Sequence, residues 1–219
     1  MSAFRIISLT ALACFWCVAL LALRFHSSGS TGFSFLIWNL FLAAIPLGFS
    51  LLLEKVRHWS LALPLLASWL LFFPNAPYVL TDLVHLRVRG DVPLWLDLLM
   101  LLSFALVSLW MGFQSLRLVQ HWVARRTSTA VSWLFVLTSL ILSGFGIYLG
   151  RFLRWNSWDI ISRPGALLGD ITMRLMDPLA HGRTWGVTLG FGGLLIIAYL
   201  FWIFAAVPAR QEPSPARHE

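Results

Sequence analysis

The residues of this chain best suited to chemistry follow an apolar segment that two prolines interrupt. Residues 72–86 read Phe-Phe-Pro-Asn-Ala-Pro-Tyr-Val-Leu-Thr-Asp-Leu-Val-His-Leu, so that Asn75, Tyr78, Asp82 and His85 come directly after or within the break. Acidic and imidazole side chains at membrane depth cost free energy, and a cluster of them indicates a functional site. The chemistry that they could supply is proton transfer, with Asp82 or His85 as the catalytic acid or base.

A second unusual stretch lies at residues 146–159, which read Gly-Ile-Tyr-Leu-Gly-Arg-Phe-Leu-Arg-Trp-Asn-Ser-Trp-Asp. On a helix, Arg151 and Arg154 are three positions apart and project from the same face. Two guanidinium groups suit an anionic group such as a phosphate, which they can bind through paired hydrogen bonds. Asn156 or Ser157 could cap a short helix that follows.

The composition is that of an integral membrane protein. Hydrophobic residues make up 59% of the 219 residues and charged residues only 11%, far from the balance of soluble domains. The basic side chains that give the chain its net charge of +7 are expected to contact lipid headgroups. Membrane lipids are therefore the expected partners. Nucleic acid is not expected as a partner, because no basic run is interleaved with aromatic residues. Nor is a metal or cofactor expected, since the chain has a lone His in the cluster and no nucleotide-binding loop.

Apolar segments of about 20 residues, the length of a membrane-crossing helix, predict an all-α bundle. The expected spans are residues 6–23, 33–53, 59–73, 92–116, 130–150 and 187–207. Short amphipathic helices at the interface are expected after the third and fifth spans. Residues 1–207 then form a single membrane-embedded domain, and residues 208–219 a disordered polar tail. The first span resembles a secretory signal, but no cleavage pattern follows it, so we interpret it as a retained anchor.

The proline break has two possible structures. The third span is short for a bilayer of about 30 Å, so it either continues through the break or ends early and returns to the interface. If a helix begins near Ala76 with Asn75 as its cap, then Tyr78, Asp82 and His85 share one face with Arg89.

With six spans, the loops after the third and fifth spans lie on the same side of the membrane, so the two unusual stretches can meet. Asp97, just inside the fourth span, needs an opposite charge, and Arg151 and Arg154 are its predicted partners. We therefore predict one polar site. Its expected substrate- or anion-binding residues are Asn75, Tyr78, Asp97, Arg151, Arg154, Asn156 and Asp159, with Asp82 and His85 as catalytic candidates.

Arg and Lys residues divide equally between the two sides of a six-span arrangement, so they leave the orientation open. Many of those on one side lie in the long loop before the last span, whose length and acidic residues indicate a folded element. The shorter loops favour cytoplasmic N- and C-termini.

The two motifs together resemble a known family. Phe-Pro-Asn-Ala-Pro-Tyr at 73–78, Thr81-Asp82-Leu83, His85, Asp97 and the block at 146–159 are similar to DUF1361, bacterial integral membrane proteins with a domain of unknown function. The resemblance covers about residues 38–204. It implies a multi-pass protein of the bacterial inner membrane, and it implies no activity, because the family has none assigned.

Two classes of function remain open from the sequence. One is a membrane enzyme that acts on a lipid-linked or phosphorylated substrate at the lipid–water boundary, with Arg151 and Arg154 holding the anionic group. The other is a non-enzymatic component, such as a small transporter or channel subunit or an assembly factor. In that case the same charges form a polar vestibule or a structural ion-pair network.

Overall fold

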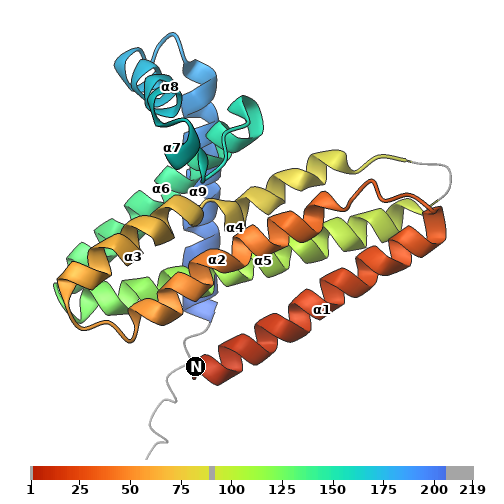
Figure 1. Ribbon diagram of the computed structural model, residues 1–219, viewed down its shortest axis with the longest axis horizontal. Coiled ribbons are helices and arrows are strands. Elements are labelled where there is room, and N and C mark those ends of the chain that lie inside the picture. Colours follow the sequence, from red (N-terminus) through yellow and green to blue (C-terminus); the bar gives the residue numbers. More distant parts are fainter. Residues whose placement is uncertain (1, 89–91, 206–219) are drawn as a thin grey trace, which may run out of the picture.

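The computed structural model describes residues 2–88 and 92–205. Within these residues, six helical segments are long and apolar enough to cross a membrane, which confirms the expected all-α bundle. The segments are α1 (Ala3–Ser28), α2 (Phe35–Leu53), Trp59–His85, α5 (Leu94–Ala124), α6 (Thr129–Leu153) and α9 (Gly182–Ala205). Figure 1 shows the short helices α7 (Asp159–Ser162) and α8 (Pro164–Met176) at the end of the bundle where α6 ends and α9 begins. The expected tail at 208–219 lies outside the described residues.

Several helices run beyond the apolar segments that predicted them. The longest is α5, whose 31 residues make a helix of roughly 46 Å in place of the expected 92–116. Its last turns stay helical because their polar groups find partners on α9. The Tyr199 hydroxyl donates to Gln120 Oε1 at 2.8 Å, and the Arg117 guanidinium lies 5.5 Å from the centre of the Trp202 ring.

The third segment changes its hydrogen bonding at the two prolines but keeps its direction. Helix α3 (Trp59–Phe72) is followed by α4 (Asn75–Tyr78) and the 3₁₀ helix η1 (Val79–His85). Phe73 and Pro74 between them keep right-handed helical dihedral angles, and Figure 1 shows one continuous path. The segment therefore continues through the break, and α4 and η1 form its last turns.

The expected role of Asn75 as a helix cap is wrong. Pro74 occupies the position before α4, and no side chain caps that helix. The Ala76 N–H donates to the Phe73 carbonyl at 3.2 Å, and the Phe72 carbonyl accepts a hydrogen bond from Asn75 Nδ2 at 2.9 Å. Asn75 is therefore the first residue of α4, and its side chain satisfies a carbonyl at the end of α3 and does not cap α4. Unsatisfied backbone groups are costly at membrane depth, so this hydrogen bond stabilises the break.

Glycines let α6 approach two neighbours closely. A Cβ added at Gly146 would lie 2.6 Å from Pro74 Cβ. The absence of a side chain at Gly146 therefore lets Pro74 pack directly against α6. A Cβ at Gly144 would lie 2.2 Å from the Thr188 carbonyl oxygen on α9. Small residues permit such contacts between membrane helices.

Replacing Gly144 by Ala is therefore expected to force α6 and α9 apart. Because the obstructing atom belongs to the α9 backbone, we expect a loss of about 1–3 kcal/mol in the free energy of unfolding, measured by denaturation in detergent. The matched control is Gly190→Ala on α9, where an added Cβ has no neighbour within 4 Å. Alanine's higher helix propensity makes that control neutral or slightly stabilising. An equal effect of both substitutions would contradict the close contact.

Candidate functional site

Asp82 and Arg151 form an ion pair between η1 and the last turn of α6. Arg151 Nη2 lies 2.5 Å from Asp82 Oδ1, and the Asp82 side chain is only 2% exposed. The other carboxylate oxygen, Oδ2, accepts a hydrogen bond from Asn39 Nδ2 of α2 at 2.8 Å. Three helical segments are thus joined at one buried carboxylate, and the predicted meeting of the two sequence stretches is confirmed.

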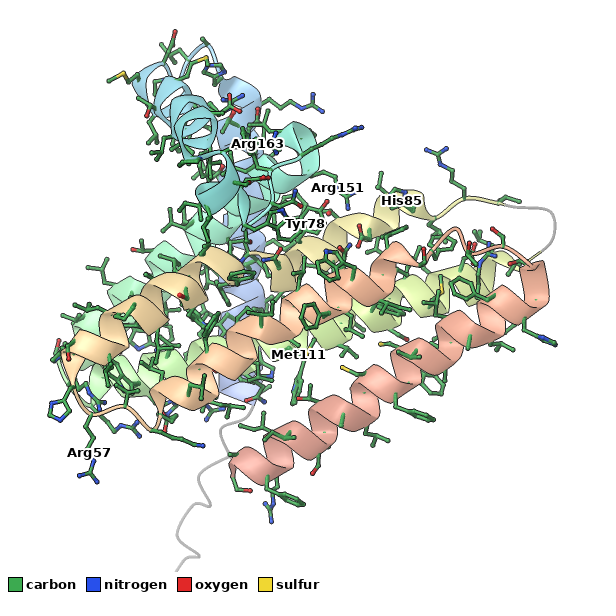
Figure 2. The ribbon with its side chains drawn as sticks, viewed as in Figure 1. Arg57, Tyr78, His85, Met111, Arg151 and Arg163 are labelled. Carbon is green, nitrogen blue, oxygen red and sulfur yellow. The ribbon has the colours of Figure 1, made fainter. Side chains whose placement is uncertain are left out.

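The 3₁₀ geometry of η1 arranges the rest of this cluster. With three residues per turn, side chains three positions apart align, so Thr81 lies beside Tyr78. The Thr81 hydroxyl donates to the Tyr78 carbonyl at 2.6 Å and accepts from Arg151 Nε at 2.9 Å. The Arg151 guanidinium lies 4.8 Å from the centre of the Tyr78 ring. Figure 2 shows Tyr78 and Arg151 close together, with His85 farther along η1. We call Asn39, Tyr78, Thr81, Asp82 and Arg151 the Asp82 cluster.

A pocket of about 390 Å³ opens beside the Asp82 cluster. Its walls come from α2, the proline break, the last turns of α6, the segment after α6, and α8. The lining residues are Trp38, Asn39, Leu42, Leu71, Pro74, Asn75, Tyr78, Gly146, Leu149, Gly150, Arg154, Trp155, Asn156, Ser157 and Leu167. Asn39 and Tyr78 belong to both the pocket and the Asp82 cluster, so the ion pair supports one wall of the pocket.

Arg154 is the one charged residue among those described along the pocket wall. Across residues 2–88 and 92–205, no carboxylate forms an ion pair with it, whereas Arg151 and Arg163 are both paired. Its backbone has a φ of 61°, in the left-handed region, at the end of α6. This conformation costs an L-residue free energy and is characteristic of glycine at such positions. A strained, exposed and unpaired cation in a pocket is a candidate ligand-binding group.

A hydrogen-bonded clasp closes the side of the pocket at the proline break. Asn75 Nδ2 donates to Ser157 Oγ at 2.9 Å, and the Ser157 hydroxyl donates to the Leu71 carbonyl at 3.1 Å. The loop after α6 is therefore fixed to the end of α3. Four of the predicted binding residues, Asn75, Tyr78, Arg154 and Asn156, line the pocket; their role in binding stays a prediction.

The pocket also reaches the outer surface of α2. Trp38 lines it and is 53% exposed, on the same helix face as the exposed Ile37 and Phe41. The Trp38 ring contacts Trp158 edge to face, with centroids 6.1 Å apart. In a membrane-spanning helix an exposed apolar face meets lipid, so this edge of the pocket lies next to the bilayer.

The predicted pairing of Asp97 with Arg151 or Arg154 is wrong. Asp97 Oδ1 lies 3.0 Å from Arg24 Nε, near the end of α1, and the two side chains are 1% and 4% exposed. Arg24 also donates to Ser28 Oγ and lies 5.1 Å from the centre of the Phe33 ring. Asp97 thus holds α1 against the start of α5 and does not contribute to the pocket wall.

Asp159 and His85 also lie away from the pocket lining. Asp159 Oδ2 accepts from the Asn156 backbone N–H at 2.9 Å, and Oδ1 accepts from Ser162 Oγ at 2.9 Å. The Asn156 N–H is the main cause that lowers the pKa of Asp159 to about 2, so this carboxylate stays ionised and orders the turn before α7. The His85 ring packs edge to face on Phe35, with centroids 5.2 Å apart. Arg89 lies outside the described residues.

Sequence reasoning missed Asn39, Trp38 and the structural role of Ser157. Asn39 could have been identified from the sequence, because it is an amide side chain within a helix that is otherwise strongly apolar, and polar groups in membrane helices usually contact other helices. Trp38 could not have been identified, since tryptophan is common at membrane interfaces.

Comparison with known proteins gives a family and no activity. No curated protein and no solved structure matches the chain. A family model described as "Protein of unknown function (DUF1361)" matches residues 38–198, which include most of α2, the proline break, the Asp82 cluster and the pocket walls. The chain is a member of the DUF1361 family.

Proposed function

We propose that the pocket binds the anionic headgroup of a lipid-linked or phosphorylated molecule at the membrane–water boundary. The observation that carries this proposal is Arg154, a cation on the pocket wall with no ion-pair partner among the described residues. A guanidinium group presents several donors in a fixed plane and suits phosphate and carboxylate oxygens. Asn75, Asn156 and Ser157 add neutral polar groups around it.

The position and size of the pocket support a ligand that enters from the bilayer. A volume of about 390 Å³ lies within the range of roughly 300–1,000 Å³ of small-molecule sites. The wall at Trp38 adjoins the lipid-facing surface of α2, so an acyl or prenyl chain can remain in the membrane while the headgroup contacts Arg154.

The contacts of Asp82 favour binding over proton transfer. Both of its carboxylate oxygens already accept hydrogen bonds, from Arg151 and Asn39, and neither Asp82 nor His85 lines the pocket. A general base must come within hydrogen-bond reach of its substrate proton. We therefore assign Asp82 a positioning role and propose a protein that binds or passes on an anionic amphiphile.

We also propose that the protein lies in the inner membrane of a bacterium, with both termini in the cytoplasm. The loops at 54–58 and 125–128 are short and carry Lys55, Arg57, Arg125 and Arg126. Basic residues in short loops favour the cytoplasmic side.

Cysteine labelling of intact cells is expected to support this orientation. In a chain with Cys14 and Cys17 replaced by Ala, a membrane-impermeant maleimide should label Val88→Cys and Leu179→Cys from outside, because these side chains are 83% and 96% exposed. His58→Cys should react only after the membrane is opened. The reverse pattern would contradict the orientation. Labelling of Val88→Cys and Leu179→Cys from different sides would contradict the six-span arrangement, which places both residues on one side of the membrane.

Headgroup selectivity tests the binding proposal itself. Three amphiphiles with the same tail and phosphate, phosphocholine or maltose headgroups are titrated into the purified full chain. We expect the phosphate compound to bind about tenfold or more tightly than the other two, because a hydrogen bond to a charged group contributes about 1.5–3 kcal/mol. Equal affinity for all three would show that tail burial alone drives binding, and would overturn the proposal.

A further inference from the structure

The charged and apolar faces of helix α8 are arranged in the opposite way to those of a surface helix on a water-soluble protein. Its two charged residues face the protein: Arg174 is 8% exposed, and Asp170 Oδ2 accepts from Trp155 Nε1 at 2.7 Å. Its exposed positions carry no charge. They include Leu168 at 56%, Leu175 at 54% and Met176 at 82%.

The inward charges are fixed by contacts with α6 and with each other. Arg174 Nη1 donates to Asp170 Oδ1 at 3.0 Å and to the Asp170 carbonyl at 2.6 Å. The Arg174 guanidinium also lies 5.8 Å from the centre of the Tyr148 ring. These contacts determine which face of α8 points outward, so the exposed apolar face is a feature of the folded protein. A surface helix in contact with water has the opposite arrangement.

The apolar surface continues before the start of α8, where Ile161 is 84% exposed. The chain on either side enters the spans α6 and α9, whose outer faces also meet lipid. Basic residues flank the helix on both sides. Arg163 has a side chain that is 58% exposed, and Arg183 is exposed beside Phe152, 4.3 Å from the centre of that ring.

We propose that α8 is seated in the membrane surface, with its uncharged face against acyl chains and with Arg163 and Arg183 at the lipid phosphates. Amphipathic helices lie at this depth with apolar residues in the acyl boundary and basic residues at the headgroups. The exposed face of α8 by itself is too small for a stable dimer. The 13 residues of α8 give a face of roughly 20 by 10 Å, whereas stable interfaces bury about 800 Å² per partner.

Collision accessibility of spin labels tests this placement in the full chain. Single labels are attached at Leu168→Cys and Met176→Cys, with Cys14 and Cys17 replaced by Ala, and the protein is reconstituted in phosphatidylethanolamine and phosphatidylglycerol vesicles. Phe201→Cys on α9, 73% exposed, is the lipid reference, and His58→Cys in the loop before α3 is the water reference. Melting temperatures confirm folding of each variant, and Met173→Cys, 53% exposed, replaces a variant that fails.

We expect the α8 labels to match Phe201→Cys, with frequent collisions with oxygen and few with a water-soluble nickel chelate. A match to His58→Cys would show that α8 lies in water and would overturn the proposal. Low collision rates with both reagents would show that a second copy covers the face, and would also overturn it.

Discussion

Replacing Asp97 by Asn is expected to lower the free energy of unfolding by about 3–5 kcal/mol. The substitution keeps the shape of the side chain and removes its charge. Arg24, which is 4% exposed and 3.0 Å from Asp97, then remains in the bundle with an uncompensated charge. Chemical denaturation of the purified protein in detergent measures the change.

The exposed ion pair between Glu54 and Arg125 is the matched control. Its atoms lie 2.9 Å apart, but the side chains are 32% and 56% exposed. Glu54→Gln is therefore expected to cost less than about 1 kcal/mol. Replacing both members of the buried pair, as in Arg24→Met with Asp97→Leu, should cost less than Asp97→Asn alone. Equal losses at the buried and exposed pairs would contradict the assigned role of the Arg24–Asp97 pair.

The sequence predicted the architecture because its signals are local. Length and apolarity locate membrane helices without knowledge of their neighbours, and Pro74 and Pro77 mark the break because they lack backbone donors. The meeting of Asp82 with Arg151 followed from the number of spans, since six crossings place the loops near them on one side. These predictions needed no detail of how the helices pack.

The partner of Asp97 depended on packing that the sequence does not reveal. Arg24 and Arg151 both lie at the same end of the bundle, and only the rotation and order of the helices decide which one meets Asp97. Helices that are apolar on all sides carry no periodic stripe to fix that rotation. Arg24 also lay just outside the expected span at 6–23, where an arginine is typical of a loop. Arg154 could be named from the sequence, but its left-handed backbone could not.

Replacing Arg154 by Gly is expected to change stability and ligand binding in opposite directions. Glycine adopts the left-handed conformation of residue 154, φ 61°, without the steric cost of about 1 kcal/mol that an L-residue bears. Greater flexibility of the unfolded chain offsets part of this gain, so stability should stay equal or rise by up to about 1 kcal/mol. The same substitution removes the cation from the pocket. Affinity for a phosphate amphiphile should fall about tenfold to a hundredfold.

Arg87→Gln is the control for loss of a basic residue outside the pocket. Arg87 lies in the loop after η1, on the same side of the six-span bundle as Arg154, yet it is exposed and does not line the pocket. Its removal should leave the affinity for the phosphate amphiphile within about twofold of the original, as expected for an exposed surface charge.

The most direct measurement is isothermal titration of the phosphate amphiphile into the original chain, Arg154→Gly and Arg87→Gln, with the stability of each protein determined in the same detergent. We expect weak binding only for Arg154→Gly, in a protein at least as stable as the original. An Arg154→Gly protein that binds as tightly as the original would contradict the assignment of this pocket as an anionic headgroup site.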